Sequence, residues 1–153
     1  MLRRWRPAIF LTVVLLGELA IFLTTTLVID RPRPPVEHLD SELPPTSSFP
    51  SGHTAAAICL YGGIAALILF NTRARWRWPA VAVAVLVVLA VAAARLYRGA
   101  HFPTDVLGSI LFAVPWLVIT VALLRPRNSP PTGTARRPAG IRGGPRTAQS
   151  GRP

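Results

Sequence analysis

Four long apolar blocks, separated by shorter polar stretches, limit the folds open to this chain more than any other feature. They lie at residues 8–29, 54–70, 79–94 and 106–124. The first contains 22 residues, and Glu18 is its only charge. A hydrocarbon core ~30 Å thick needs roughly 20 helical residues, so each block is close to one membrane thickness in length. A soluble globule of this size cannot bury such blocks, and we predict an all-α, polytopic membrane bundle of four transmembrane helices.

The basic start of the chain allows a second interpretation, a secretory signal peptide. Arg3, Arg4 and Arg6 precede the first apolar block, as the charged region of a signal peptide would. Signal peptides have an apolar region of about 7–15 residues followed by a small-residue cleavage site. This block is longer, and the threonines at 24–26 lead on to arginines instead. A retained first span is therefore the better interpretation.

The distribution of arginine predicts the orientation of the bundle. All seventeen cationic residues are arginine, and thirteen of them lie before the first block, between the second and third, or after the fourth. Only four lie in the two remaining connections. Because arginine-rich loops stay in the cytoplasm, we expect a multi-pass plasma-membrane protein with both termini cytoplasmic and the other two loops extracytoplasmic.

The end of the chain differs in composition from the rest. Residues 1–125 contain the apolar blocks and form the predicted membrane domain, whereas residues 126–153 are mostly Pro, Gly, Arg, Ser and Thr. Such a tail cannot bury a core, and we expect it to be disordered. The net charge of +11 would suit nucleic acid, but the tail has no aromatic residue on which bases could stack. We therefore expect no nucleic-acid partner, and a tail that attracts anionic lipid of the bilayer.

Residues capable of chemistry gather in three stretches that the topology brings to one membrane face. They are residues 31–34, 50–53 and 95–105. Ionisable groups near membrane depth are costly, so their clustering indicates function. His38 is different, because it lies in a proline-rich acidic loop, and we interpret it as solvated.

The middle stretch has the features of an oxyanion site. Pro50 favours extended backbone before it, and Ser51 can then cap the helix that begins here. Gly52 leaves space beside the free N–H groups of the helix start, where a phosphate can bind. His53 follows at once and could donate a proton to an oxygen that leaves the phosphate.

The third stretch supplies a base and its partner. Asp105 lies four residues after His101 and can reach a ring nitrogen, which would fix the tautomer and leave the other nitrogen to attack. Arg33 and Arg95 would supply planar cationic forks for phosphoryl oxygens. Pro103 suits the first turn of the last helix. Arginines and helix N–H groups can hold the transition-state charge, so we expect neither a metal nor a cofactor.

Taken together, the three stretches resemble the signature motifs of the type 2 phosphatidic acid phosphatase family, whose fold is shared with the vanadium haloperoxidases. The resemblance covers roughly residues 26–105 and agrees in order, spacing and membrane side. It implies that His101 is a nucleophile forming a phosphohistidine, that Asp105 orients it, and that His53 protonates the leaving group. The residues that would hold the phosphate are Arg33, Ser51, Gly52 and Arg95.

The sequence departs from that family in three ways. The first motif opens with a lysine where this chain has Thr26, and the third opens with a serine where it has Ala94. Arg31 could replace the lysine in part. The family also has two helices ahead of the span that leads into the first motif, so we expect either a minimal form or a start further upstream. A second protomer could then cover the exposed flank, with Glu18 at such an interface or inside the bundle.

These observations predict a metal-independent membrane lipid phosphatase. Its substrate would be isoprenyl diphosphate, phosphatidic acid or phosphatidylglycerol phosphate, with the headgroup in the site and the tail in the bilayer. Thr26 and Ala94 leave one alternative, a catalytically weak protein that binds lipid phosphate or serves as a subunit of a larger assembly.

Overall fold

The computed structural model describes residues 5–36 and 47–124, and the predicted tail at 126–153 lies outside that part. The described residues form four helices, α1 (Arg6–Val28), α2 (Gly52–Asn71), α3 (Arg77–Tyr97) and α4 (Pro103–Leu124). Each is long and apolar enough to cross a membrane. The predicted all-α architecture with four spans is confirmed, and no helix end differs from the predicted block end by more than three residues.

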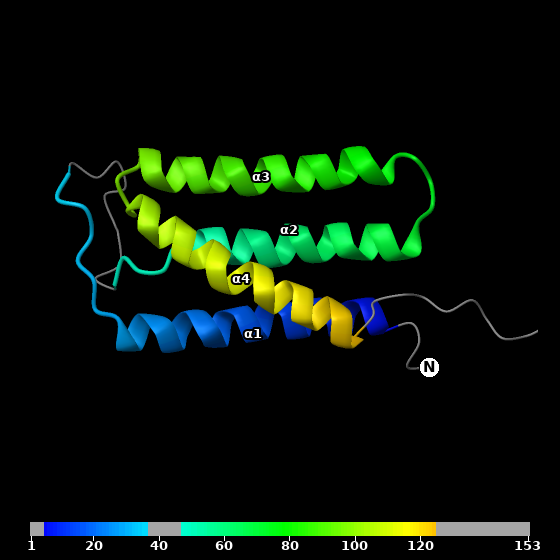
Figure 1. Cartoon of the computed structure of the whole chain (residues 1–153), viewed down its shortest axis with the longest axis horizontal. Coiled ribbons are helices and arrows are strands. Elements are labelled where there is room, and N and C mark those ends of the chain that lie inside the picture. The colour runs from blue at the N-terminus through cyan, green and yellow to red at the C-terminus, as the bar shows by residue number, and fades with distance from the viewer. Residues whose placement is uncertain (1–4, 37–46, 125–153) are drawn as a thin grey trace, which may run out of the picture.

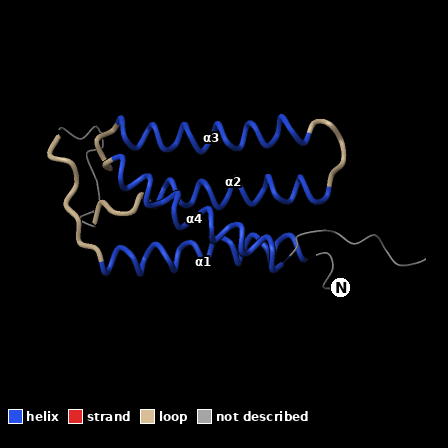
Figure 2. The backbone as a smooth tube through the Cα atoms, in the orientation of Figure 1, coloured by secondary structure: helices blue, strands red, loops and turns tan. Residues whose placement is uncertain are grey.

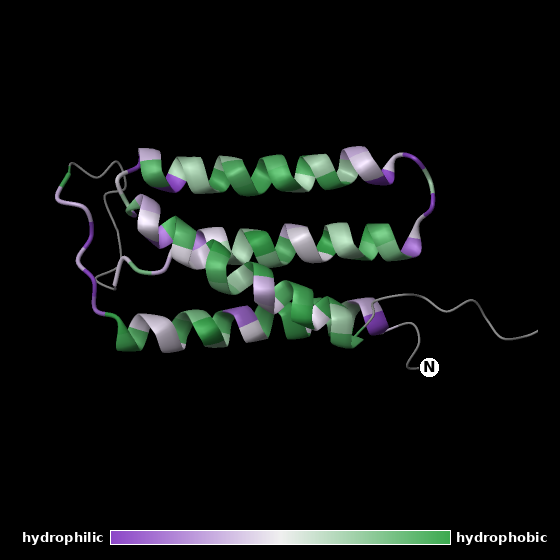
Figure 3. Cartoon of the chain, in the orientation of Figure 1, coloured by the Kyte–Doolittle hydropathy of each residue, from purple (hydrophilic) through white to green (hydrophobic). Residues whose placement is uncertain are grey.

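Successive helices run in opposite directions, which places related connections together. Figure 1 shows the end of α1, the start of α2, the end of α3 and the start of α4 at one end of the bundle. The turn from α2 to α3 lies at the opposite end. The helices are apolar over most of their length, and hydrophilic residues concentrate in the connections (Figure 3). The three stretches that the sequence singled out therefore meet at one end.

Local sequence explains where the fourth helix begins. Gly99 has a φ of 69°, a left-handed conformation that glycine adopts without strain, and it reverses the chain after α3. Pro103 is the first residue of α4, where its missing N–H has no helical partner to lose. This confirms the position predicted for Pro103.

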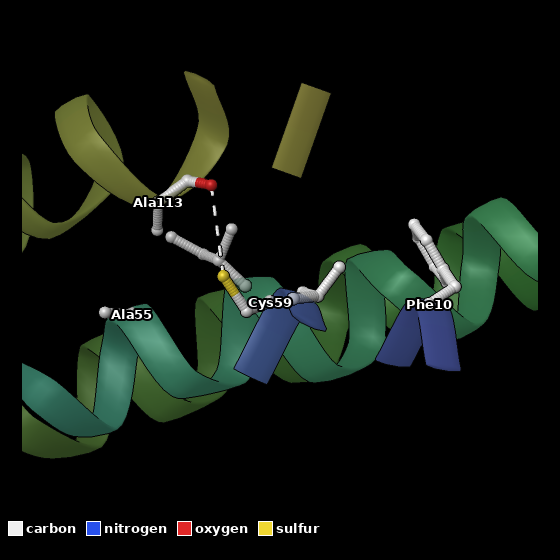
Figure 4. Close-up of a cluster of buried hydrophobic side chains, with 6 residues drawn as sticks. Phe10, Ala55, Cys59 and Ala113 are labelled. Carbon is white, nitrogen blue, oxygen red and sulfur yellow. Dashed lines mark hydrogen bonds between the residues drawn. The ribbon is translucent and has the colours of Figure 1, made fainter. Parts of the chain in front are cut away.

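The hydrophobic core is small and lies where α1, α2 and α4 pack closely together. Phe10 and Val14 of α1 pack against Ala55, Ile58 and Cys59 of α2 and Ala113 of α4, and Figure 4 shows the Cys59 thiol directed at the Ala113 carbonyl. Small residues continue this surface along α2. A side chain at Gly62 would meet Leu117 of α4, and one at Gly63 would meet Leu11 of α1. The two glycines thus allow close packing of the helices.

α4 crosses from the end of α3 toward α1 (Figure 1). Trp116 of α4 packs against α1 at this crossing. The indole N–H of Trp116 donates to the carbonyl of Val14 over 2.9 Å. Its ring lies over Gly17, where an added Cβ would stand 2.0 Å from the ring. Glu18 is only 5% exposed, so it lies inside the bundle rather than on its lipid-facing surface.

α3 occupies the edge of the bundle. None of its residues is buried, and it packs chiefly on α2. Val83, Leu86 and Leu89 are exposed along it. In a bilayer such a face meets lipid tails or another helix, and the predicted homo-oligomer stays a prediction.

We predict that Gly17→Ala destabilises the bundle by about 1–3 kcal/mol, because the new methyl group displaces the Trp116 ring from α1. The thermal-unfolding midpoint of the purified protein in detergent measures the loss. In a Trp116→Leu background the same substitution should cost much less, because the smaller side chain leaves room. An equal loss in both backgrounds would contradict this role of the tryptophan.

Candidate active site

The candidate site is built from three connections at one end of the bundle. Figure 2 shows these loops, in tan, after α1, before α2 and between α3 and α4. Their described residues are 29–36, 47–51 and 98–102. The site residues predicted from the sequence lie in these loops and in the adjoining helix turns.

Two of the loops are joined by main-chain and serine hydrogen bonds. The N–H of Ser48 donates to the carbonyl of Arg31 over 2.8 Å, and the N–H of Arg31 donates to Ser47 Oγ over 3.1 Å. The hydroxyl of Ser48, which is fully buried, donates to the carbonyl of Pro32 over 3.0 Å. The stretch before α2 is thereby fixed against the stretch after α1.

His101 lies between α3 and α4 and is 7% exposed. Its Nδ1 is 2.7 Å from the carbonyl oxygen of Ser48. A carbonyl can only accept, so Nδ1 carries the proton and Nε2 keeps its lone pair. The acceptor differs from the one predicted: Asp105 Oδ2 is 3.7 Å from Nδ1, within ion-pair range but too far for a hydrogen bond.

Asp105 is fully buried in the first turn of α4, and other donors occupy its carboxylate. Oδ2 accepts the N–H of Phe102 over 2.8 Å, which satisfies a free donor at the helix start. Oδ1 accepts Arg31 NH1 over 2.7 Å. Arg31, which was expected to replace in part the lysine missing at Thr26, thus engages this carboxylate, and its partial replacement of the lysine stays a prediction.

Two further guanidinium groups approach the buried histidine. Arg33 NH1 donates to the carbonyl of Ala100, the residue before His101, over 2.9 Å. Arg95 lies in the last turn of α3. Burial lowers the pKa of Arg33 and the charge of Arg95 lowers it further, against the opposite effect of Asp105. The two neighbouring positive charges repel each other, and a phosphate bound near both of them would be stabilised.

The start of α2 is the third component. Ser51 is fully buried and precedes the helix, but its hydroxyl pairs with the hydroxyl of Thr54 over 3.0 Å instead of capping the backbone, which corrects the predicted cap. At Gly52 a side chain would stand 2.9 Å from the Phe22 ring of α1. His53 is in the first turn and exposed.

The charges around His101 act on its protonation. Burial lowers its pKa below the usual value, and the positive charges of Arg33 and Arg95 add to that effect. The Ser48 carbonyl and Asp105 act in the opposite direction. The net lowering keeps the ring neutral, which is the form that can attack an electrophile.

Sequence reasoning missed two serines that complete the arrangement. Ser48 supplies the acceptor for the His101 ring. The hydroxyl of Ser109, buried on α4, shares its one proton between the carbonyls of Ser51 and Asp105, at 2.8 and 2.9 Å, and so links the start of α2 to α4. A pair of serines before Phe49 was visible in the sequence, but nothing in it gave their partners.

The predicted site residues thus divide into a group around the buried His101 and one exposed residue, His53. His101, Asp105 and Arg33 are linked by contacts or charge, with Arg95 and Ser51 beside them. His53 lies at the exposed flank. In the described ranges, no three His, Cys, Asp or Glu side chains gather as the ligands of a metal ion would.

The sequence of this bundle matches a known class of membrane protein. The PAP2 superfamily pattern matches residues 6–129, most of the chain, and the protein is a member of that superfamily. The resemblance seen in the motifs is thereby confirmed.

A particular relative is undecaprenyl-diphosphatase BcrC of Bacillus subtilis (strain 168), which is 34% identical to this chain over 92 residues. The match covers 58% of this chain and 43% of that protein. The chain thus spans less than half the length of this relative. No solved structure gave a significant match.

We predict that Ser109→Ala lowers the free energy of unfolding by about 1 kcal/mol, because the Ser51 carbonyl loses a buried donor. Thermal unfolding in detergent measures the change. Thr120→Val is the matched control: Thr120 is also buried on α4, but its hydroxyl bonds only its own helix, at the Trp116 carbonyl. An equal effect of the two substitutions would contradict a role for Ser109 between helices.

Proposed function

We propose that this protein is a membrane lipid phosphatase that hydrolyses a phosphomonoester or a diphosphate through a phosphohistidine. One observation carries the proposal: a buried histidine with its Nδ1 proton on a carbonyl and with arginine charges beside it. That combination suits a nucleophile directed at an anion.

In the proposed first step, Nε2 of His101 attacks phosphorus and the bond from phosphorus to the leaving oxygen breaks. Arg33 and Arg95 stabilise the phosphoryl oxygens through charged hydrogen bonds. His53 gives its proton to the leaving oxygen. In the second step, water attacks phosphorus, the bond from phosphorus to Nε2 breaks, and His53 takes the proton of the water. Phosphate and the free ring of His101 are regenerated.

The position of the site supports a lipid substrate. The connections that hold it lie at one end of a bundle with four candidate membrane spans. A headgroup can enter there while the hydrocarbon tail stays in the bilayer, and the arginine distribution favours the extracytoplasmic face. Among the candidate substrates, the name of the Bacillus subtilis relative favours isoprenyl diphosphate over phosphatidic acid and phosphatidylglycerol phosphate.

A second candidate function is binding of lipid phosphate with little turnover. Thr26 and Ala94 motivate it, since the resembling family has lysine and serine at these positions. Binding without turnover, as a single chain or as a subunit of a larger assembly, is the outcome that would replace the proposal.

We expect the purified protein in lipid vesicles to release phosphate from isoprenyl diphosphate in excess chelator, and His101→Ala to reduce release at least 1,000-fold because the nucleophile is lost. Phosphate release is the measurement. His38→Ala is the matched control, which removes a histidine outside the motifs and should keep wild-type activity.

A substrate with labelled phosphate separates the two candidate functions. A phosphatase should yield an acid-labile label on the protein, absent from His101→Ala. Turnover that survives the substitution would overturn the mechanism, whereas tight binding without turnover or label would favour the binding protein.

We expect kcat/KM to stay near its maximum as the pH falls through 6.5. Burial and the nearby arginines hold the pKa of His101 below its usual 6.5, and only the neutral ring attacks. Protonation, and with it the loss of activity, should therefore begin at a lower pH than for an ordinary histidine. A pH profile of kcat/KM measures this, and an acidic limb centred above 6.5 would contradict it.

A further inference from the structure

The side chain of Arg31 contacts three residues at the start of α4. Its NH1 lies 2.7 Å from Asp105 Oδ1 and 2.7 Å from Thr104 Oγ1, and both oxygens accept from it. Its guanidinium carbon lies 4.4 Å from the centre of the Phe102 ring, a cation–π distance. Arg31 is half-buried while Asp105 is fully buried, so the ion pair is shielded on the side of the carboxylate.

The backbone of Arg31 contacts the other support of the histidine. Its carbonyl accepts the N–H of Ser48, and the carbonyl of Ser48 in turn accepts the Nδ1 proton of His101. Arg31 thus touches two of the groups near the His101 ring: residue Ser48 through its main chain and Asp105 through its side chain.

The contact distances show that Asp105 and His101 have different hydrogen-bond partners. Oδ1 of Asp105 is taken by Arg31 and Oδ2 by the N–H of Phe102, so both carboxylate oxygens have donors. The His101 ring is left 3.7 Å from Oδ2 and bonds the neutral Ser48 carbonyl instead. Without Arg31 the carboxylate would keep only the N–H of Phe102 as a donor and would be less restrained against turning toward the ring.

We propose that Arg31 is a positioning residue for His101: it holds Asp105 in place and leaves the Ser48 carbonyl as the acceptor of the Nδ1 proton. The inference rests on the proposed function, in which His101 is the nucleophile. Arg31 acts through Asp105 and Ser48, and the phosphate remains the ligand of Arg33 and Arg95.

Charged groups on the neighbouring elements set the pH at which His101 is expected to titrate. Arg33 faces the ring from the stretch after α1, Arg95 from α3 and Asp105 from α4, while α2 contributes the exposed His53. Asp105 raises the pKa of His101, and Arg31 offsets part of its negative charge. Removing Arg31 should therefore raise the pKa of His101.

The test is a titration of the protein labelled with ¹⁵N-histidine in detergent micelles. The chain has only three histidines, so the His101→Ala variant assigns the signals of His101. In the wild type the neutral ring should carry its proton on Nδ1. In Arg31→Gln the titration midpoint should rise by about one pH unit, the size expected for one charge acting at short range. Arg31→Lys keeps the charge and should stay near the wild-type midpoint.

A double substitution shows whether the effect passes through the carboxylate. In an Asp105→Asn background, Arg31→Gln should move the midpoint much less than in the wild type. Arg75→Gln is the matched control: Arg75 belongs to the turn between α2 and α3, which lies at the opposite end of the bundle (Figure 1), and its loss should change neither midpoint nor turnover. If Arg31→Gln does not fold, Arg31→Lys provides the test. The neutral ring of His101 should keep its proton on Nδ1 in this variant, and a proton found on Nε2 instead would overturn the proposal.

Turnover provides a second readout. Arg31→Gln should lower kcat about tenfold and change KM less than threefold, because Arg31 has no contact with the phosphate in this scheme. An unshifted midpoint in Arg31→Gln overturns the inference even if the wild type is an active phosphatase. A wild type without turnover overturns the proposed function, whereas the titration still decides the role of Arg31.

Discussion

The buried carboxylate of Asp105 is the interaction on which the candidate site depends. Its side chain accepts Arg31 from the loop after α1 and the N–H of Phe102 at the start of its own helix, while its carbonyl accepts the N–H of Ser51 before α2. A buried carboxylate is costly unless its oxygens have donors. The requirement for those donors draws three connections, distant in the sequence, to one point beside His101.

The apolar bundle brings these connections together although few of its residues are buried inside it. Lipid is as apolar as a leucine side chain, so spanning helices gain from close packing rather than from removing apolar surface from water. The contacts at Gly17, Gly62 and Gly63 are of this kind, and those at Gly17 and Gly62 bring α4 across α1 and α2. That crossing carries the start of α4, with Asp105, to the loops after α1 and before α2. Packing within the membrane thus places the polar groups at its edge.

Much of the fold was predictable from the sequence, and part of the site was. The apolar blocks predicted all four helices because the length of a span is a property of one segment, and Pro103 marked a helix start for a similarly local reason. His101 and Asp105 lie within ion-pair distance, 3.7 Å, as their spacing predicted, but the hydrogen bond of the ring goes to the Ser48 carbonyl instead. Their spacing allows contact, but the competition among Arg31, Phe102 and the ring for two carboxylate oxygens is settled by loops from elsewhere in the chain.

The sequence by itself determined the class of the protein: four spans, polar connections at one end, and a match to the PAP2 superfamily over residues 6–129. These are properties of length, composition and order along the chain. Only the tertiary structure decided which acceptor meets the His101 ring and what Arg31 contacts. Hydrogen bonds require partners within about 3 Å and in a suitable direction, and such distances between segments exist only after the helices have packed.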